Sequence, residues 1–62
     1  MEVKMYDMDT LEYCGSIFAD GGSWRFQGVT NEHLISMTKG MPFKAVLASL
    51  VGFQIVYDII EE

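Results

Sequence analysis

Cys14 and His33 are the residues of this 62-residue chain best suited to nucleophilic chemistry, because an imidazole beside a thiol can activate it for attack. The chain holds one cysteine and one histidine. Cys14, however, lies between Tyr13 and Gly15 in an alternating segment, without the features of a nucleophile elbow or a helix start. Free cysteine is commonly buried. We therefore expect a structural Cys14, a solvent-facing His33 on a helix, and no enzymatic activity.

Acidic residues near the start of the chain could bind a cation or act as an acid-base pair. Asp7, Asp9 and Glu12 lack the alternating oxygen ligands, central glycine and terminal glutamate of a calcium loop. Zinc ligation by Cys14 and His33 would lack the usual close spacing of paired ligands. We expect neither a metal nor another cofactor, and we interpret these acids as a solvated turn.

The glycine-rich segment Asp20-Gly21-Gly22-Ser23 could present backbone N–H groups to a phosphate. A P-loop needs a GK[ST] sequence at the start of a helix, and a dinucleotide site needs GxGxxG within a βαβ unit. Here the glycines separate two alternating segments, and adjacent glycines favour the positive φ values of a hairpin turn. The segment therefore predicts a turn.

Trp24, Arg25 and Phe26 form the candidate partner-binding site, because tryptophan and arginine are enriched at binding hot spots. Aromatic residues on a sheet, with Tyr13 added, could also stack RNA bases, and they could equally fill the core under two helices. RNA binding needs a basic rim, but the chain has nine acidic and four scattered basic residues and a net charge of −5. Direct nucleic-acid binding is therefore disfavoured.

Four segments with alternating apolar and polar side chains predict the strands that position these residues. The strands are expected at residues 2–8, 11–18, 24–27 and 53–60. Alternation places Trp24 and Phe26 on one side of the third strand, and Tyr13 on the same face as Ile17. The last strand is apolar on one face and half apolar on the other, so we expect it inside the sheet or against another chain.

Helix signals occupy the segment between the third and fourth strands. Thr30 and Asn31 are good N-caps for a short helix that Gly40 ends, and Pro42 suits the first position of a second helix over 42–51. The predicted fold is α+β: a mostly antiparallel sheet of order β-β-β-α-α-β with two short helices packed on one face. One kinked helix over residues 31–51 is the alternative.

Length and composition favour one folded domain over residues 1–62, since half of the residues are apolar and 21% are charged. The most apolar stretch, 41–57, is interrupted by Pro42 and Lys44, so we expect no membrane span. Residues 1–10 lack the pattern of a secretory signal, and a single thiol suits a reducing compartment. We therefore expect a cytoplasmic protein.

The leading hypothesis is a small acidic, non-enzymatic protein-interaction module, such as an inhibitor or regulatory accessory protein, that acts as a homodimer. The chain carries more apolar sequence than 62 residues easily enclose, and its negative charge favours a protein partner with a basic surface. Two alternatives stay open. One is a small-molecule-binding protein or minimal enzyme with a pocket at a dimer interface, using Cys14, His33 or the acids near Asp9. The other is a structural subunit of a larger assembly.

Overall fold

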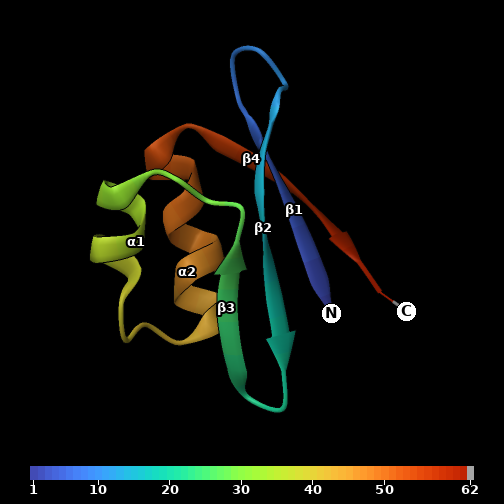
Figure 1. Cartoon of the computed structure of the whole chain (residues 1–62), viewed down its shortest axis with the longest axis vertical. Helices are drawn as coiled ribbons and strands as arrows, with labels where there is room; N and C mark the ends of the chain where they lie inside the picture. Colours follow the sequence, from blue (N-terminus) through green and yellow to red (C-terminus); the bar gives the residue numbers. More distant parts are fainter. Residues whose placement is uncertain (62) are drawn as a thin grey trace.

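The computed structural model describes residues 1–61 and shows one sheet with two helices on one side (Figure 1). In chain order the elements are β1 (Glu2–Asp7), β2 (Tyr13–Asp20), β3 (Ser23–Gln27), α1 (Glu32–Thr38), α2 (Phe43–Leu50), the 3-10 turn η1 (Val51–Phe53) and β4 (Ile55–Ile60). This order confirms the predicted β-β-β-α-α-β fold of the α+β class. It also decides for two helices over one kinked helix.

The four strands form an antiparallel sheet in the order β3-β2-β1-β4, so β3 and β4 are its two edges. Of the two placements expected for the last strand, inside the sheet or against another chain, the first is therefore wrong, and the second stays a prediction. Two successive hairpins already place β2 on one side of β1 and β3 beyond it, so the returning chain pairs with the free side of β1 (Figure 1). Among the described residues, β1 is the only strand beside β4.

The core lies between the sheet and the two helices. Val3 and Met5 are fully buried, while Lys4 between them points to the opposite face, as alternation predicted. Each fully buried aliphatic side chain stabilises the fold by about 1.5–3 kcal/mol. The buried apolar residues are Val3, Met5, Ile17, Leu34, Val46, Leu50 and Ile55.

We call the face of the sheet opposite the helices the open face. Its residues follow from the strand register, which places side chains of the same face directly opposite one another. The open face carries Glu2, Lys4 and Tyr6 of β1, Ser16 and Phe18 of β2, Arg25 and Gln27 of β3, and Val56, Asp58 and Ile60 of β4.

The helix ends follow their predicted caps closely. Asn31 caps α1, and its Oδ1 accepts a hydrogen bond from the Leu34 N–H at 3.1 Å. Pro42 is the N-cap of α2, one position before the predicted one. Val51, the last residue of the second helix as predicted, lies beyond its end and is 65% exposed, because α2 ends at Leu50 and the tighter turn η1 follows. No helix within residues 1–61 has the length and apolar character to cross a bilayer.

A β-bulge at Cys14 corrects the expected face of Tyr13. The β1–β2 register shifts here and leaves Cys14 without a partner in β1. One extra residue reverses the alternation that follows it toward the start of the strand. Tyr13 therefore lies on the open face, where its hydroxyl is 2.6 Å from the Ser16 Oγ, and not on the face of Ile17.

Candidate protein-interaction surface

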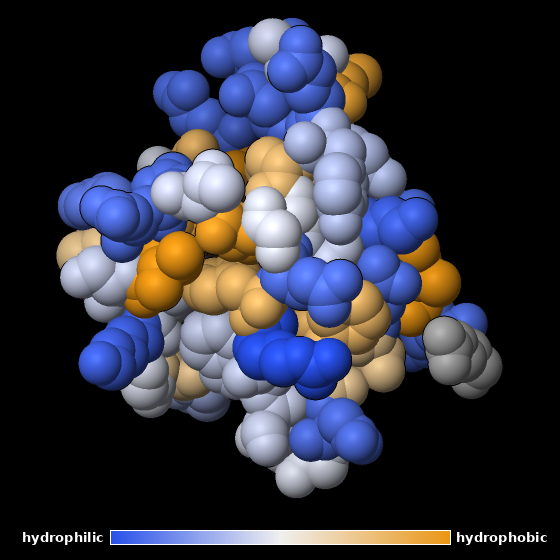
Figure 2. Space-filling model, viewed as in Figure 1, coloured by the Kyte–Doolittle hydropathy of each residue, from blue (hydrophilic) through white to orange (hydrophobic). Residues whose placement is uncertain are grey.

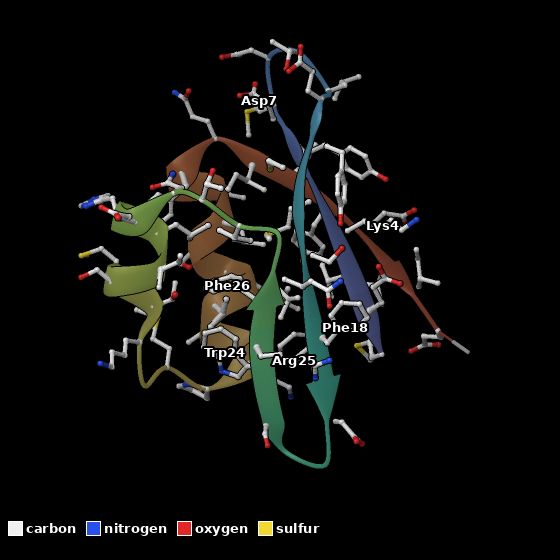
Figure 3. All side chains as sticks on the ribbon, in the orientation of Figure 1. Lys4, Asp7, Phe18, Trp24, Arg25 and Phe26 are labelled. Carbon is white, nitrogen blue, oxygen red and sulfur yellow. The ribbon has the colours of Figure 1, made fainter. Side chains whose placement is uncertain are left out.

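Trp24, Arg25 and Phe26 occupy successive positions of β3, and the pleat of the strand divides them between the two faces of the sheet (Figure 3). Trp24 and Phe26 point toward the helices and are half-buried, and their rings meet edge to face with centroids 5.1 Å apart. Arg25 is exposed on the open face. The three side chains therefore do not share one face, and their role in partner binding stays a prediction.

Trp24 ties the β3 edge to the helix layer. Its Nε1–H donates a hydrogen bond of 2.7 Å to the carbonyl oxygen of Met41, in the segment between α1 and α2. Trp24 and Phe26 both pack against the buried core. The inner sides of these two rings therefore belong to the core, as one alternative expected. Only their outer parts are accessible to a partner.

Arg25 forms the accessible part of the predicted site together with Phe18. The Arg25 guanidinium lies over the Phe18 ring, with its central carbon 5.1 Å from the ring centroid, which is a cation–π contact. Both residues line a shallow hollow of about 260 Å³ beside the β2–β3 turn, with Asp20, Ser23 and Trp24. This hollow joins two of the three predicted residues, Trp24 and Arg25, around the edge of the sheet.

A second aromatic position on the open face is held by hydrogen bonds. The Ser16 hydroxyl donates to the Glu2 Oε2 at 3.2 Å, so the Tyr13 hydroxyl donates to Ser16. The Tyr6 ring meets the Tyr13 ring edge-on, with centroids 6.0 Å apart. Tyr13 is 57% exposed yet held in one orientation, and a preorganised ring loses little conformational entropy on binding. Sequence periodicity missed this position because of the bulge at Cys14.

Within residues 1–61, ten large apolar side chains are exposed, while seven apolar side chains are buried and eight more pack half-buried against them. Scattered apolar residues are ordinary on protein surfaces, but a run of them along an edge strand is a candidate interaction surface. Such a run lies on β4, where Val56, Tyr57 and Ile59 are 37%, 40% and 43% exposed. Hydrophobic atoms are visible at the right margin of Figure 2, where β4 runs. Apolar residues on both faces of the last strand were the sequence signal for this run.

The candidate nucleophile lines a small pocket but is not activated there. Cys14 borders a pocket of about 140 Å³ together with residues of β1, α1 and η1. Burial, and then the negative charge of Asp7, raise the pKa of the Cys14 thiol. A thiol with a raised pKa stays protonated at neutral pH and is a poor nucleophile.

His33 is exposed on α1, as predicted, and is not a lining residue of the Cys14 pocket. Its ring contacts the Phe53 ring edge-on, with centroids 5.5 Å apart. The pocket therefore contains no imidazole that could take the proton of the Cys14 thiol.

The acids of the β1–β2 loop shape a turn. Asp7 Oδ1 accepts hydrogen bonds from the N–H groups of Asp9 at 2.8 Å and Thr10 at 3.1 Å, which confirms the predicted turn. This loop forms the hydrophilic end at the top of Figure 2. Within residues 1–61, no three side chains of His, Cys, Asp or Glu gather closely enough to hold a metal ion.

The described part of the chain thus presents two accessible regions, one around Arg25 and Phe18 and one along β4. Comparison with protein-family models, with curated proteins and with solved structures finds no match for this chain.

Proposed function

We propose that this protein is a small, acidic, non-enzymatic protein-interaction module that acts as a homodimer and inhibits or regulates its partner. The observation that carries the proposal is that ten large apolar side chains within residues 1–61 are exposed, among them the run along β4. Removing apolar surface from water is the main favourable term in protein association. A domain of this size also gains from association the stability that its small core supplies only in part.

Charge favours a partner with a basic surface. The chain carries a net charge of −5, and three of its acids lie at the two turns on opposite ends of the sheet. Asp9 and Glu12 are exposed in the β1–β2 loop, and Asp20 is exposed at the β2–β3 turn. Such an acidic rim accelerates encounter with a basic partner and disfavours acidic ones.

The partner-binding surface that we propose is the region around Arg25, with the exposed side of Phe18 and the outer part of Trp24. Arginine above an aromatic ring, next to a shallow hollow, offers both an apolar platform and a directed charge. The raised pKa of the Cys14 thiol supports a structural role for this residue and a non-enzymatic protein.

The test is a matched pair of truncations, Arg25→Ala and Lys39→Ala. Arg25 and Lys39 are both exposed, and the two variants change the net charge by the same amount. Lys39, however, lies at the end of α1, away from the open face. Partners are isolated with the tagged wild-type protein, purified, and titrated by calorimetry. We expect Arg25→Ala to weaken binding about thirtyfold or more, the range of a hot-spot residue, while Lys39→Ala binds like wild type.

Equal binding by both variants would place the partner surface elsewhere on the molecule. The alternative of a minimal enzyme predicts a different result: Cys14→Ala or His33→Ala would abolish an activity and leave the fold intact. Under the interaction proposal, these two variants bind the partner as wild type does.

A further inference from the structure

The hydrogen bonding of β1 shows which backbone groups of β4 are free. Met1 and Ala19 exchange two backbone hydrogen bonds, Met1 N to Ala19 O at 3.1 Å and Ala19 N to Met1 O at 3.0 Å. Hydrogen-bonded pairs alternate along an antiparallel ladder, so odd-numbered β1 residues bond to β2 and even-numbered ones bond to β4. The hydrogen bond from the Met8 N–H to the Gln54 carbonyl oxygen, at 2.8 Å, follows the same alternation, because residue 8 is even-numbered and Gln54 directly precedes β4.

The partners of the even-numbered β1 residues are Val56, Asp58 and Ile60, whose backbone groups therefore point inward. The remaining residues, here called the outward set, are Ile55, Tyr57 and Ile59, and they direct their N–H and C=O groups away from the sheet. These six groups form a ready row of donors and acceptors for one more strand.

Asp58 is the one charged residue of β4, so little protects this edge from pairing. Proteins protect edge strands with lysine, proline, bulges or a covering element, but Ile55–Ile60 contains neither lysine nor proline. The register against β1 runs without a bulge. Tyr57 and Ile59 also keep large exposed fractions on the face that the helices cover elsewhere in the sheet.

We infer that two copies of this protein pair through β4, antiparallel about a twofold axis at Tyr57. With Tyr57 opposite its own symmetry mate, Ile55 of each copy lies opposite Ile59 of the other. Every member of the outward set then faces another member, and each facing pair exchanges two hydrogen bonds. The exposed side chains of Tyr57 and Ile59 gain cross-strand apolar neighbours on the helix side of the sheet.

The two neighbouring symmetric registers, with the axis at Val56 or at Asp58, are less favourable. With the axis at Tyr57, Asp58 lies opposite the apolar Val56 of the other copy. An axis at Asp58 would set two carboxylates directly opposite each other, which is destabilising, and would place Ile55 opposite Glu61, beyond the end of the strand. An axis at Val56 would place Ile59 opposite Phe53, in the turn η1. Only the axis at Tyr57 sets all three members of the outward set opposite one another. A second copy therefore fits the edge in one preferred register, which is the argument for self-pairing over an unrelated strand.

This inference rests on the homodimer part of the proposed function and is independent of the partner surface around Arg25. Pairing joins two four-stranded sheets into one continuous sheet and sets two open faces side by side. Each copy carries a net charge of −5, so repulsion between copies opposes the dimer. Added salt screens that repulsion and should strengthen the dimer.

The first test measures the mass of the full chain by analytical ultracentrifugation over a hundredfold concentration range. Wild type should rise from 7.0 kDa toward twice that mass. Ile59→Lys places a charge on the free edge, and we expect it to raise the dissociation constant of the dimer tenfold or more. The variant should then be mostly monomeric at concentrations where wild type is dimeric. Ile35→Lys is the matched control, because Ile35 is 40% exposed on α1, and it should dimerise like wild type. Circular dichroism verifies that both variants are folded.

The second test addresses the register with Val56→Lys and Val56→Asp. In the proposed register residue 56 faces Asp58 of the other copy, so lysine should tighten the dimer relative to aspartate by tenfold or more. Ser36→Lys and Ser36→Asp change the net charge identically at an exposed site on α1 and supply the baseline. A difference at 56 no larger than that at 36 would overturn the register.

The outcomes separate this inference from the proposed function. Wild type that stays monomeric at every concentration overturns both the homodimer and the β4 interface. A dimer that survives Ile59→Lys overturns the β4 interface alone and leaves the homodimer in place. Loss of the dimer in Ile59→Lys, with its retention in Ile35→Lys, supports pairing through β4.

Discussion

The two edges of the sheet, β3 and β4, differ in what lies beside them. On β3, Trp24 and Phe26 pack under the helices, and the Trp24 indole is hydrogen-bonded to the carbonyl of Met41 (Figures 1 and 3). On β4, Tyr57 and Ile59 occupy the same face of the sheet but stay exposed. Two short helices thus cover one edge and leave the other accessible. The inner side chains of β3 therefore contribute to the stability of the fold, whereas those of β4 remain accessible to another molecule.

The chain also enters the two edges differently. Before β3, Gly21 and Gly22 supply the positive φ values of the turn, 56° and 89°. Before β4, the residue with positive φ is Gln54, at 60°. A non-glycine residue in this left-handed region costs about 1–2 kcal/mol, so the entrance to β4 stores strain that the entrance to β3 avoids.

The largest difference that we expect between the two edges is in the free energy of unfolding, when Trp24→Ala on β3 is compared with Tyr57→Ala on β4. Trp24→Ala removes a half-buried ring and its hydrogen bond to Met41, and we expect a loss of about 2–4 kcal/mol in the free energy of unfolding. Tyr57→Ala removes a largely exposed ring, and we expect a loss below about 1 kcal/mol. Urea denaturation of dilute, monomeric protein measures both.

A domain of this size has little stability to lose, so Trp24→Phe serves as a milder companion to Trp24→Ala. It keeps an aromatic ring and removes the indole donor, with an expected loss of about 1 kcal/mol. Similar losses for the Trp24 and Tyr57 variants would contradict the difference between the edges.

Local periodicity was sufficient to predict the elements, because each signal lies within a few residues of the structure that it specifies. The Gly21-Gly22 pair predicted the turn into β3, and Asn31 predicted the start of α1. Alternation also placed Trp24 and Phe26 on one side of β3, so the division of the candidate site between two faces was already contained in the pattern.

Long-range pairing was not predictable in the same way. The position of β4 depends on which side of β1 is free, and no residue within the strand encodes that choice. The bulge at Cys14 likewise depends on how two strands meet, and it moved Tyr13 to the open face. The β4 edge and the exposed Tyr13 ring could therefore be located only once the sheet order and register were known.

A smaller difference in stability is expected when the glycine before β3 is removed and a glycine is introduced before β4. Gly22→Ala should destabilise the protein by about 1 kcal/mol, because an added Cβ meets no atom within 4 Å and the cost comes only from the positive φ. Gln54→Gly should stabilise it by about 0.5 kcal/mol, since relief of strain exceeds the entropy cost of glycine. Thermal unfolding of both variants beside wild type measures the difference. Destabilisation by Gln54→Gly would show that its side chain stabilises the entrance to β4.

The smallest contrast lies on the open face, between Arg25→Ala on β3 and Asp58→Ala on β4. Arg25→Ala removes the cation–π contact with Phe18, and we expect a loss of about 0.5–1 kcal/mol. Asp58 lies opposite Lys4 in the register but is exposed, and we expect less than about 0.5 kcal/mol from its loss. Urea denaturation at low and high salt checks both values. Because the open face contributes so little to stability, a large effect of either substitution on partner binding would report the interface itself and not a change in the fold.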